Sequence, residues 1–244
     1  MPEYAGAVND GLAALSTFVV GGSTLRETLD RVATLAKATV SGADFVGLTL
    51  LKDGRPTTAV FTDEASPEID QAQYDSGVGP CVDAFRDNQV YRIQSTDDDD
   101  RWAAFSQAAL EKGIHSSLSL PLSVGGRGVG ALNMYSRAVD AFGDEEERVG
   151  VAFASQAAVA VANAQTYWEA KEVAQHLNEA MKSRAAIEQA KGMLMAAQGC
   201  APDDAFDLLV KASQRTNRKL RDLAEEMVAN AQRRRNGAPS AEAS

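Results

Sequence analysis

The stretch from Asp144 to Gln198 constrains this chain more than any other feature, because it contains no proline and only two glycines, Gly150 and Gly192. Proline is the strongest helix breaker, so the stretch predicts one long helix, or two helices joined by a small break. At 1.5 Å per residue such a helix is on the order of 80 Å long and needs a partner surface. We expect its alanine-rich first part to pack on a sheet and its later part to form a coiled coil in a homodimer.

The chain is long enough for two domains. Its 244 residues exceed one ordinary domain, and 45% hydrophobic with 24% charged residues is typical of soluble globular proteins. Two cysteines, Cys81 and Cys200, exclude a disulfide framework and indicate a reducing compartment. The N-terminus lacks a signal-peptide pattern, and polar residues interrupt the most apolar later stretch. We therefore expect a cytoplasmic protein.

Charge is unevenly distributed along the chain. The net charge of −10 argues by itself against a nucleic-acid partner. However, residues 1–165 hold 12 basic and 23 acidic side chains, whereas residues 166–244 hold 12 and 11. Within residues 211–235, eight basic side chains outnumber three acidic ones. The acidic excess is therefore N-terminal, and the C-terminal part is suited to contact phosphates.

The residues before the long helix mix strand and helix periodicities, which predicts an α+β or α/β domain with helices packed on a sheet. Residues 24–40 predict a helix that begins with a capping box at Thr24 and Glu27. Two pairs of strands flank glycine-containing turns and predict hairpins. These strands are expected at 45–51, 57–61, 117–124 and 128–135.

A long segment separates the two predicted hairpins. Pro80 and Cys81 predict the start of a short helix, residues 89–93 a short strand, and residues 101–112 another helix. Long connections over a sheet are common places for ligand pockets. We therefore expect any ligand of this domain to bind near this segment.

The C-terminal part predicts three short amphipathic helices, the first being the end of the long helix. Gly199 ends that helix, and Pro202 begins the second. The second is expected to bury Ala205, Phe206, Leu208, Leu209 and Ala212. The third is expected to bury Leu220, Leu223, Ala224, Met227, Val228 and Ala231. Together they can close a small all-α core, followed by a disordered tail from residue 236.

Residue types that carry catalysis or bind metals are few. His115 and His176 are the only histidines, which gives histidine-based catalysis little support. The acidic run 97–100 lacks the glycine and the distant glutamate of a calcium-binding loop. Cys81 lies where a helix N-terminus lowers a thiol pKa, yet a buried inert cysteine is the more frequent case. We expect no catalytic residue, no metal site and no cofactor.

Basic residues flank the apolar stripes of the C-terminal helices. Arg184 and Lys191 share one flank of the long helix, with Gly192 beside them, and Arg218 and Arg221 share a polar side of the third helix. A glycine within a helix costs about 1 kcal/mol relative to alanine, so Gly192 indicates close approach by another helix or by a nucleic-acid backbone. A solvated face and a phosphate-contacting surface both fit these patterns.

Two sequence blocks in residues 184–228 are specific. Ile-Glu-Gln-Ala-Lys-Gly occupies 187–192, and Asn-Arg-Lys-Leu-Arg-Asp-Leu-Ala occupies 217–224. At this spacing they resemble the ANTAR domain, a three-helix module of bacterial transcription antitermination regulators. The resemblance implies binding of nascent RNA with two adjacent hairpins, whose unstacked loop bases are accessible to protein. The resemblance and the basic flanks together predict RNA binding by Arg184, Ala190, Lys191, Gly192, Asn217, Arg218, Lys219 and Arg221.

Residues from about 22 to 165 resemble a GAF domain of the kind that precedes ANTAR in actinobacterial regulators. The resemblance rests on Gly-Val-Gly-Pro-Cys-Val-Asp-Ala at 77–84, Arg-Trp at 101–102, Ser-Leu-Ser-Leu-Pro-Leu at 117–122 and Gly-Ala-Leu-Asn-Met-Tyr at 130–135. The resemblance implies an α+β domain, an antiparallel sheet with flanking helices, that serves as a small-molecule sensor whose ligand is unknown. Met134 stands where cyclic-nucleotide-binding GAF domains have lysine, so the pattern does not indicate a cyclic nucleotide.

The sequence therefore predicts a cytoplasmic, homodimeric antitermination regulator in which a GAF sensor acts on an ANTAR domain through the long helix. Three alternatives stay open: a DNA-binding regulator, a GAF-fold redox enzyme that uses Cys81, and an interaction scaffold. The expected parts are an N-terminal helix or extension (1–21), a GAF domain (22–165), a connecting helix (166–183), an ANTAR domain (184–235) and a disordered tail (236–244).

Overall fold

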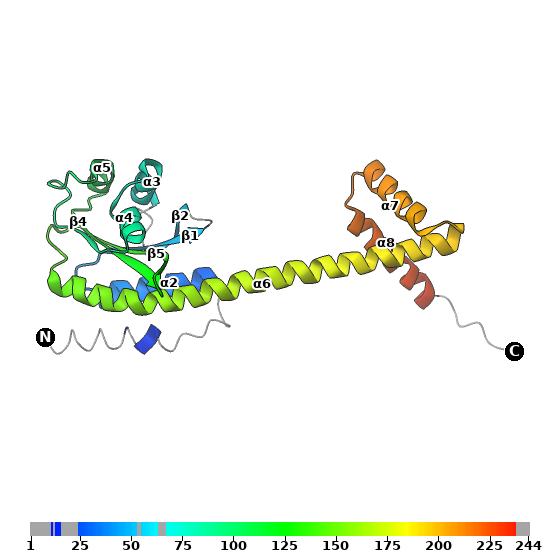
Figure 1. Ribbon diagram of the computed structural model, residues 1–244, viewed down its shortest axis with the longest axis horizontal. Coiled ribbons are helices and arrows are strands. Elements are labelled where there is room, and N and C mark those ends of the chain that lie inside the picture. The colour runs from blue at the N-terminus through cyan, green and yellow to red at the C-terminus, as the bar shows by residue number, and fades with distance from the viewer. Residues whose placement is uncertain (1–10, 12, 16–23, 53–54, 63–66, 238–244) are drawn as a thin grey trace. The chain divides into compact units, whose positions relative to one another are not determined.

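The computed structural model describes residues 11, 13–15, 24–52, 55–62 and 67–237 (Figure 1). The chain divides into two compact units, Met1–Glu169 and Ala170–Ser244. Helix α6, Asp144–Gln198, is one unbroken helix of 55 residues that contributes to both. Four acidic residues in its first turn complement the helix dipole. The prediction of a long helix is therefore confirmed.

The first unit is built on an antiparallel sheet with the strand order β2-β1-β5-β4-β3. Both predicted hairpins are present, as β1 with β2 and β4 with β5. Gly125 and Gly126 join β4 to β5 with φ of 59° and 80°, values typical of a type I′ turn and favoured by glycine. The turn at 53–54 lies outside the described residues. The strands are β1 (Phe45–Lys52), β2 (Arg55–Phe61), β3 (Tyr91–Ile93), β4 (Ser116–Val124) and β5 (Arg127–Ser136).

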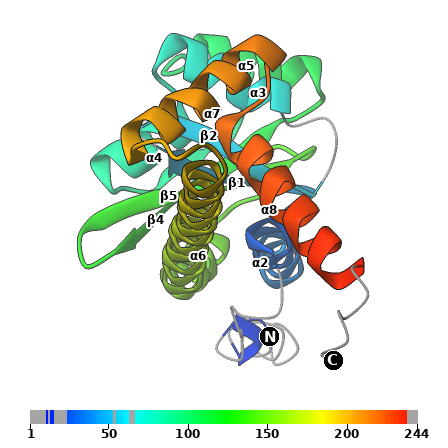
Figure 2. The same cartoon turned by 90° about the vertical axis from the view of Figure 1, so that its right-hand side faces the viewer.

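One face of the sheet is apolar and carries the main core of the first unit. Helix α2, Leu25–Thr39, and the first part of α6 lie side by side on this face (Figures 1 and 2). The predicted capping box of Thr24 and Glu27 begins α2. Alternation along the strands turns one set of side chains towards these helices. This set includes Leu48, Leu118, Leu120, Leu122, Leu132 and Met134, all fully buried.

The opposite face of the sheet is covered by three short helices (Figure 1). They are α3 (Pro67–Ser76), α4 (Pro80–Asp87) and α5 (Ala103–Glu111). Helices α4 and α5 were expected from the sequence, whereas α3 was not. Most of the α3 side chains are polar, so its sequence has no apolar period that would indicate a helix.

The second unit is a three-helix bundle formed by the end of α6, α7 (Pro202–Thr216) and α8 (Leu220–Gly237). Gly199 follows α6 with a left-handed φ of 64°, as predicted for a helix stop. Among the described residues of the bundle, only Ala190, Ala205, Leu209 and Ala224 are fully buried. Helix α8 continues to Gly237, two residues into the predicted tail, and residues 238–244 lie outside the described part.

One prediction about α7 is wrong. Phe206 and Leu208 were expected to be buried, but 40% and 36% of their surfaces are exposed. On a helical wheel these two residues lie on either side of the line through Ala205 and Leu209, which face the other helices. The bundle is narrow enough that only this central line is covered.

No helix in the described part of the chain is long and apolar enough to cross a membrane.

Candidate nucleic-acid interface and ligand site

The predicted RNA-binding residues fall into two groups within the second unit. One group lies on α6 between Arg184 and Gly192, and the other lies at the turn from α7 to α8 between Asn217 and Arg221. Arg184 and Lys219 are exposed and no ion pair of theirs is seen among the described residues. Both are therefore available to a polyanionic partner.

Ala190 differs from the rest of its group, because it is fully buried against Leu209 and Ala224. Its small side chain lets the three helices approach each other closely at the centre of the bundle. In this conformation Ala190 is a packing residue that holds its neighbour Lys191 in place, and it offers no surface to RNA.

Lys191 is held in a defined position on the flank of α6. Its ammonium lies 3.1 Å from a carboxylate oxygen of Glu188 and 6.0 Å from the centre of the Phe206 ring. Only 17% of its side chain is exposed. The Lys191 ammonium is therefore close enough to the partly exposed Phe206 ring for a cation–π attraction, while Glu188 competes with an external phosphate for its charge.

The turn between α7 and α8 presents a run of polar residues. Asn217 has a left-handed backbone, φ 50°, a conformation that asparagine tolerates better than most residues, and it ends α7. The Arg218 guanidinium lies 2.7 Å from Glu226, and that of Arg221 lies 3.3 Å from Asp222. Both pairs are exposed, so an RNA phosphate can displace the carboxylates at small cost.

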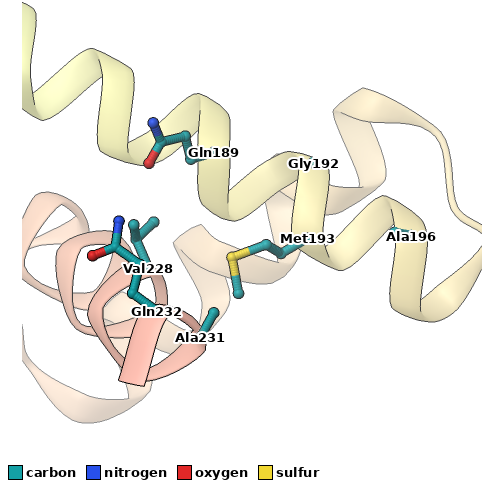
Figure 3. Close-up of a pocket in the computed structure, with 7 residues that line it drawn as sticks. All are labelled: Gln189, Gly192, Met193, Ala196, Val228, Ala231 and Gln232. Carbon is teal, nitrogen blue, oxygen red and sulfur yellow. The ribbon is translucent and has the colours of Figure 1, made fainter. Parts of the chain in front are cut away.

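Gly192 faces open space. A Cβ added there would meet no atom of this chain within 4 Å. Packing of another helix of the same chain therefore does not account for the glycine. Gly192 lines a groove between α6 and α8 whose volume is about 460 Å³ (Figure 3). Its other lining residues are Gln189, Met193, Ala196, Val228, Ala231 and Gln232.

This groove was not predicted from the sequence, although the helical spacing of its α6 residues is visible there. Gln189, Gly192, Met193 and Ala196 follow the helical spacing i, i+3, i+4 and i+7, which places them on one face of α6. This second face is distinct from the buried stripe of Ala190. A periodicity alone does not tell whether a face is a groove wall or open surface.

The second candidate site lies on the polar face of the sheet in the first unit. Thr49, Ser117, Ser119, Asn133 and Tyr135 are fully buried and alternate with the leucines of the apolar face. Among the described residues, the Ser117 and Ser119 hydroxyls and the Asn133 side-chain oxygen have no hydrogen-bond partner. Buried polar atoms are rarely left unpaired, so these three mark where a ligand or ordered water would bind.

A buried carboxylate organises the edge of this site. Asp70 on α3 accepts hydrogen bonds from the Tyr135 hydroxyl at 2.7 Å, the Thr58 hydroxyl at 3.0 Å and the Gln73 amide at 3.1 Å. Burial raises the pKa of Asp70 to about 6, because these hydrogen bonds only partly offset the loss of solvation. The network fixes α3 to β2 and β5.

Cys81 lies in the first turn of α4, as predicted, and its thiol is shielded from solvent. Its side chain is fully buried, and its sulfur lies 3.3 Å from the Thr49 hydroxyl. Burial, followed by the nearby Asp70 carboxylate, raises the pKa of the Cys81 thiol to about 12. The thiolate that nucleophilic or redox chemistry requires is therefore disfavoured, in spite of the helix N-terminus.

The start of α6 is held by contacts with β3 and with the segment between α2 and β1. Arg92 on β3 lies 3.0 Å from Asp144 and 3.3 Å from Glu147, and the Ser41 hydroxyl donates to Glu146 at 2.8 Å. Arg101 donates a hydrogen bond to the Arg92 carbonyl, so the segment next to the polar face also contacts β3.

The described residues contain no group of three or more side chains suited to hold a metal ion.

Comparison with known proteins assigns both units. A model of the GAF domain matches residues 22–162, and a model of the ANTAR domain matches residues 175–228. A search among curated proteins finds no match to the chain.

Solved structures share the fold at low sequence identity. Free methionine-R-sulfoxide reductase from Neisseria meningitidis, in complex with its substrate, is 16% identical over 67% of this chain and 91% of that chain, with a TM-score of 0.52. The GAF domain of Acinetobacter phosphoenolpyruvate-protein phosphotransferase is 14% identical over 66% and 94%, with a TM-score of 0.50. These identities show the fold alone. Because the GAF model covers more than half of its residues, the chain belongs to the GAF domain family, and it carries an ANTAR domain after the GAF domain.

Proposed function

We propose that this protein is a transcription regulator that binds hairpins of nascent RNA through its ANTAR domain and promotes antitermination. The observation that carries the proposal is the ANTAR match at residues 175–228, together with the exposed basic side chains of Arg184 and Lys219 in that region. Phosphate contacts supply affinity, and the accessible bases of hairpin loops supply specificity. The cytoplasm, where transcription takes place in bacteria, is the proposed location.

The GAF domain is proposed to modulate RNA binding in response to a small molecule of unknown identity. The unpaired atoms of Ser117, Ser119 and Asn133 support a ligand site on the polar face of the sheet. The contacts of Arg92 and Ser41 with the start of α6 offer a route by which a change at that face reaches the helix. A ligand has this effect only if it binds one arrangement of the helix more tightly than another.

A homodimer is part of the proposal. On α6, Val173, Leu177 and Met181 lie one turn apart on the same face, and more than 60% of each is exposed. Such a stripe is typical of a coiled-coil seam that pairs with a second copy. Leu177→Glu is expected to convert a dimer of the full chain into a monomer in light scattering after gel filtration. A wild-type chain with the mass of one copy would contradict the dimer.

The test of the main proposal is a gel-shift titration of the full chain with two-hairpin RNA, single-hairpin RNA and duplex DNA of matching sequence. Tightest binding to the two-hairpin RNA is expected. Preference for the duplex would instead support the alternative of a DNA-binding regulator. The redox alternative is disfavoured by the buried, protonated thiol of Cys81.

A further inference from the structure

The groove between α6 and α8 has a composition unlike the surface around it. Met193, Val228 and Ala231 form an apolar floor, and the amides of Gln189 and Gln232 extend from the two helices at its side (Figure 3). The groove is about 460 Å³ in volume and spans only two turns of α6, from Gln189 to Ala196. Its occupant is therefore compact, with a flat apolar face and polar edges.

Gly192 has no side chain and so leaves space on the α6 side of the groove. A Cβ added there would meet no atom of this chain within 4 Å, and glycine is an unfavourable residue in the middle of a helix. Gly192 thus costs helix stability at a position where a longer side chain would narrow the groove.

Nucleobases match this groove chemically. Their faces stack on apolar and thioether surfaces, and their edges pair with the donor and acceptor of a glutamine amide. The charge of this part of the sequence suits a polyanion, because residues 211–235 hold eight basic and three acidic side chains. The helix of a second copy would need a longer apolar groove than two turns of α6 provide.

We propose that one unstacked base of an RNA hairpin loop enters this groove, stacks on Met193 and Val228, and is recognised at its edge by Gln189 and Gln232. This inference rests on the proposed function, that the ANTAR domain binds RNA hairpins. It assigns base recognition to the α8 side of α6 and leaves phosphate contacts to Lys191 on the other flank and to the α7–α8 turn.

The experiment uses the full chain and a pool of two-hairpin RNAs with fixed stems and randomised loops. The wild-type protein is expected to enrich one base at one loop position. Gly192→Leu fills the groove and should lower affinity for the enriched RNA at least tenfold. Gln189→Ala should lower affinity only several-fold and relax the preference at that loop position. Gln198→Ala, the matched exposed glutamine at the end of α6, should behave as wild type.

The outcomes distinguish a failure of the proposed RNA-binding function from a failure of the groove assignment. If wild type enriches no loop and binds RNA no better than duplex DNA, the proposed function fails, and this inference fails with it. If wild type enriches a loop but Gly192→Leu enriches the same loop with equal affinity, only the groove assignment is overturned. If Gly192→Leu changes the mass of the protein in solution from two chains to one, the groove is a contact between copies and not a base pocket. Gly192→Leu is expected to keep the wild-type melting temperature or raise it, since leucine favours the helix.

Discussion

The two ends of α6 belong to one unbroken helix but lie in opposite environments. In the GAF domain, Phe153, Ala157 and Val161 are fully buried against the sheet. At the ANTAR end of α6, Ala190 is the only fully buried residue of the helix, and its large neighbours Ile187 and Leu194 are partly buried. Both ends of α6 are therefore helical, whereas the burial of large side chains is concentrated at the end in the GAF domain.

This difference teaches where the stability of the molecule resides. The GAF domain packs its sheet between two layers of helices, and its main core is extensive. The ANTAR core contains a single fully buried large side chain, Leu209, between two alanines. Small cores of this kind are marginal on their own, so the ANTAR domain should be the first part of the chain to open.

Leu209→Ala tests this contrast with the largest expected effect. Truncating a fully buried leucine costs about 3 to 4 kcal/mol, which is comparable to the whole stability of a small bundle. We expect α7 and α8 of this variant to lose hydrogen-exchange protection while β4 and β5 keep theirs. Leu132→Ala removes an equally buried leucine from the GAF core, but that domain is expected to stay folded at 25 °C.

The control for this variant is Leu208→Ala, one residue away on α7 and 36% exposed. It is expected to cost less than about 1 kcal/mol. Equal loss of protection in Leu208→Ala and Leu209→Ala would show that the buried line of the bundle does not set its stability. Unchanged protection in Leu209→Ala would remove the contrast between the two domains.

A pH dependence is expected in the GAF domain. The pKa of Asp70 is raised from 3.8 to about 6 in the folded state, so between these values the folded protein binds more protons than the unfolded chain. Stability from this group is thus fully present below pH 4 and is lost as the pH rises through 6. The loss is up to about 3 kcal/mol, from two units at 1.36 kcal/mol each.

Asp70→Asn should remove this dependence, because an amide can still accept from Tyr135 and carries no charge. Chemical denaturation of both proteins at pH 4, 5, 6 and 7 gives the difference in the free energy of unfolding. Asp207→Asn, at an exposed position on α7, serves as the control. A free energy of unfolding that changes with pH in the same way in wild type and in Asp70→Asn would contradict the prediction.

The fold was largely predictable from local sequence signals. The capping box at Thr24, the glycines of the second hairpin and the stop at Gly199 each determine a backbone conformation within a few residues, so those elements were correctly expected. Helix α3 and the exposure of Phe206 were not foreseen. Both depend on what packs against them, which a local pattern does not contain.

The candidate sites were less predictable than the fold. The position of Lys191 on a basic flank follows from helical spacing, but its pairing with Glu188 and its contact with Phe206 come from the folded bundle. The Asp70 network joins α3 and β2 to β5, where Tyr135 lies 65 residues further along the sequence. Sites of this kind need the tertiary structure, because no single segment carries their residues.

The two glycines of α6 give a matched pair of substitutions with effects of about 1 kcal/mol. A Cβ at Gly192 meets nothing within 4 Å, so Gly192→Ala should stabilise the ANTAR domain by about 1 kcal/mol through helix propensity. A Cβ at Gly150 would lie 2.8 Å from Leu120, so crowding in Gly150→Ala should outweigh that gain by about 1 kcal/mol. Thermal unfolding of each variant measures both shifts, and shifts of the same sign would contradict the contrast between the ends.

The smallest expected effect concerns the charge of Lys191 on the flank of α6. It extends the comparison of the two domains from stability to RNA binding. If Lys191 contacts a phosphate, Lys191→Ala should weaken RNA binding several-fold and reduce the slope of log affinity against log salt by about one unit. Glu188→Ala should act in the opposite direction, because it releases Lys191 from its 3.1 Å ion pair and leaves the number of phosphate contacts unchanged. Filter-binding titrations at four salt concentrations measure the affinity and the slope.

Lys112→Ala makes the same change in net charge in the acidic GAF domain and is expected to leave the slope unaltered. A slope that falls equally in Lys191→Ala and Lys112→Ala would mean that overall charge, and not this flank, governs binding.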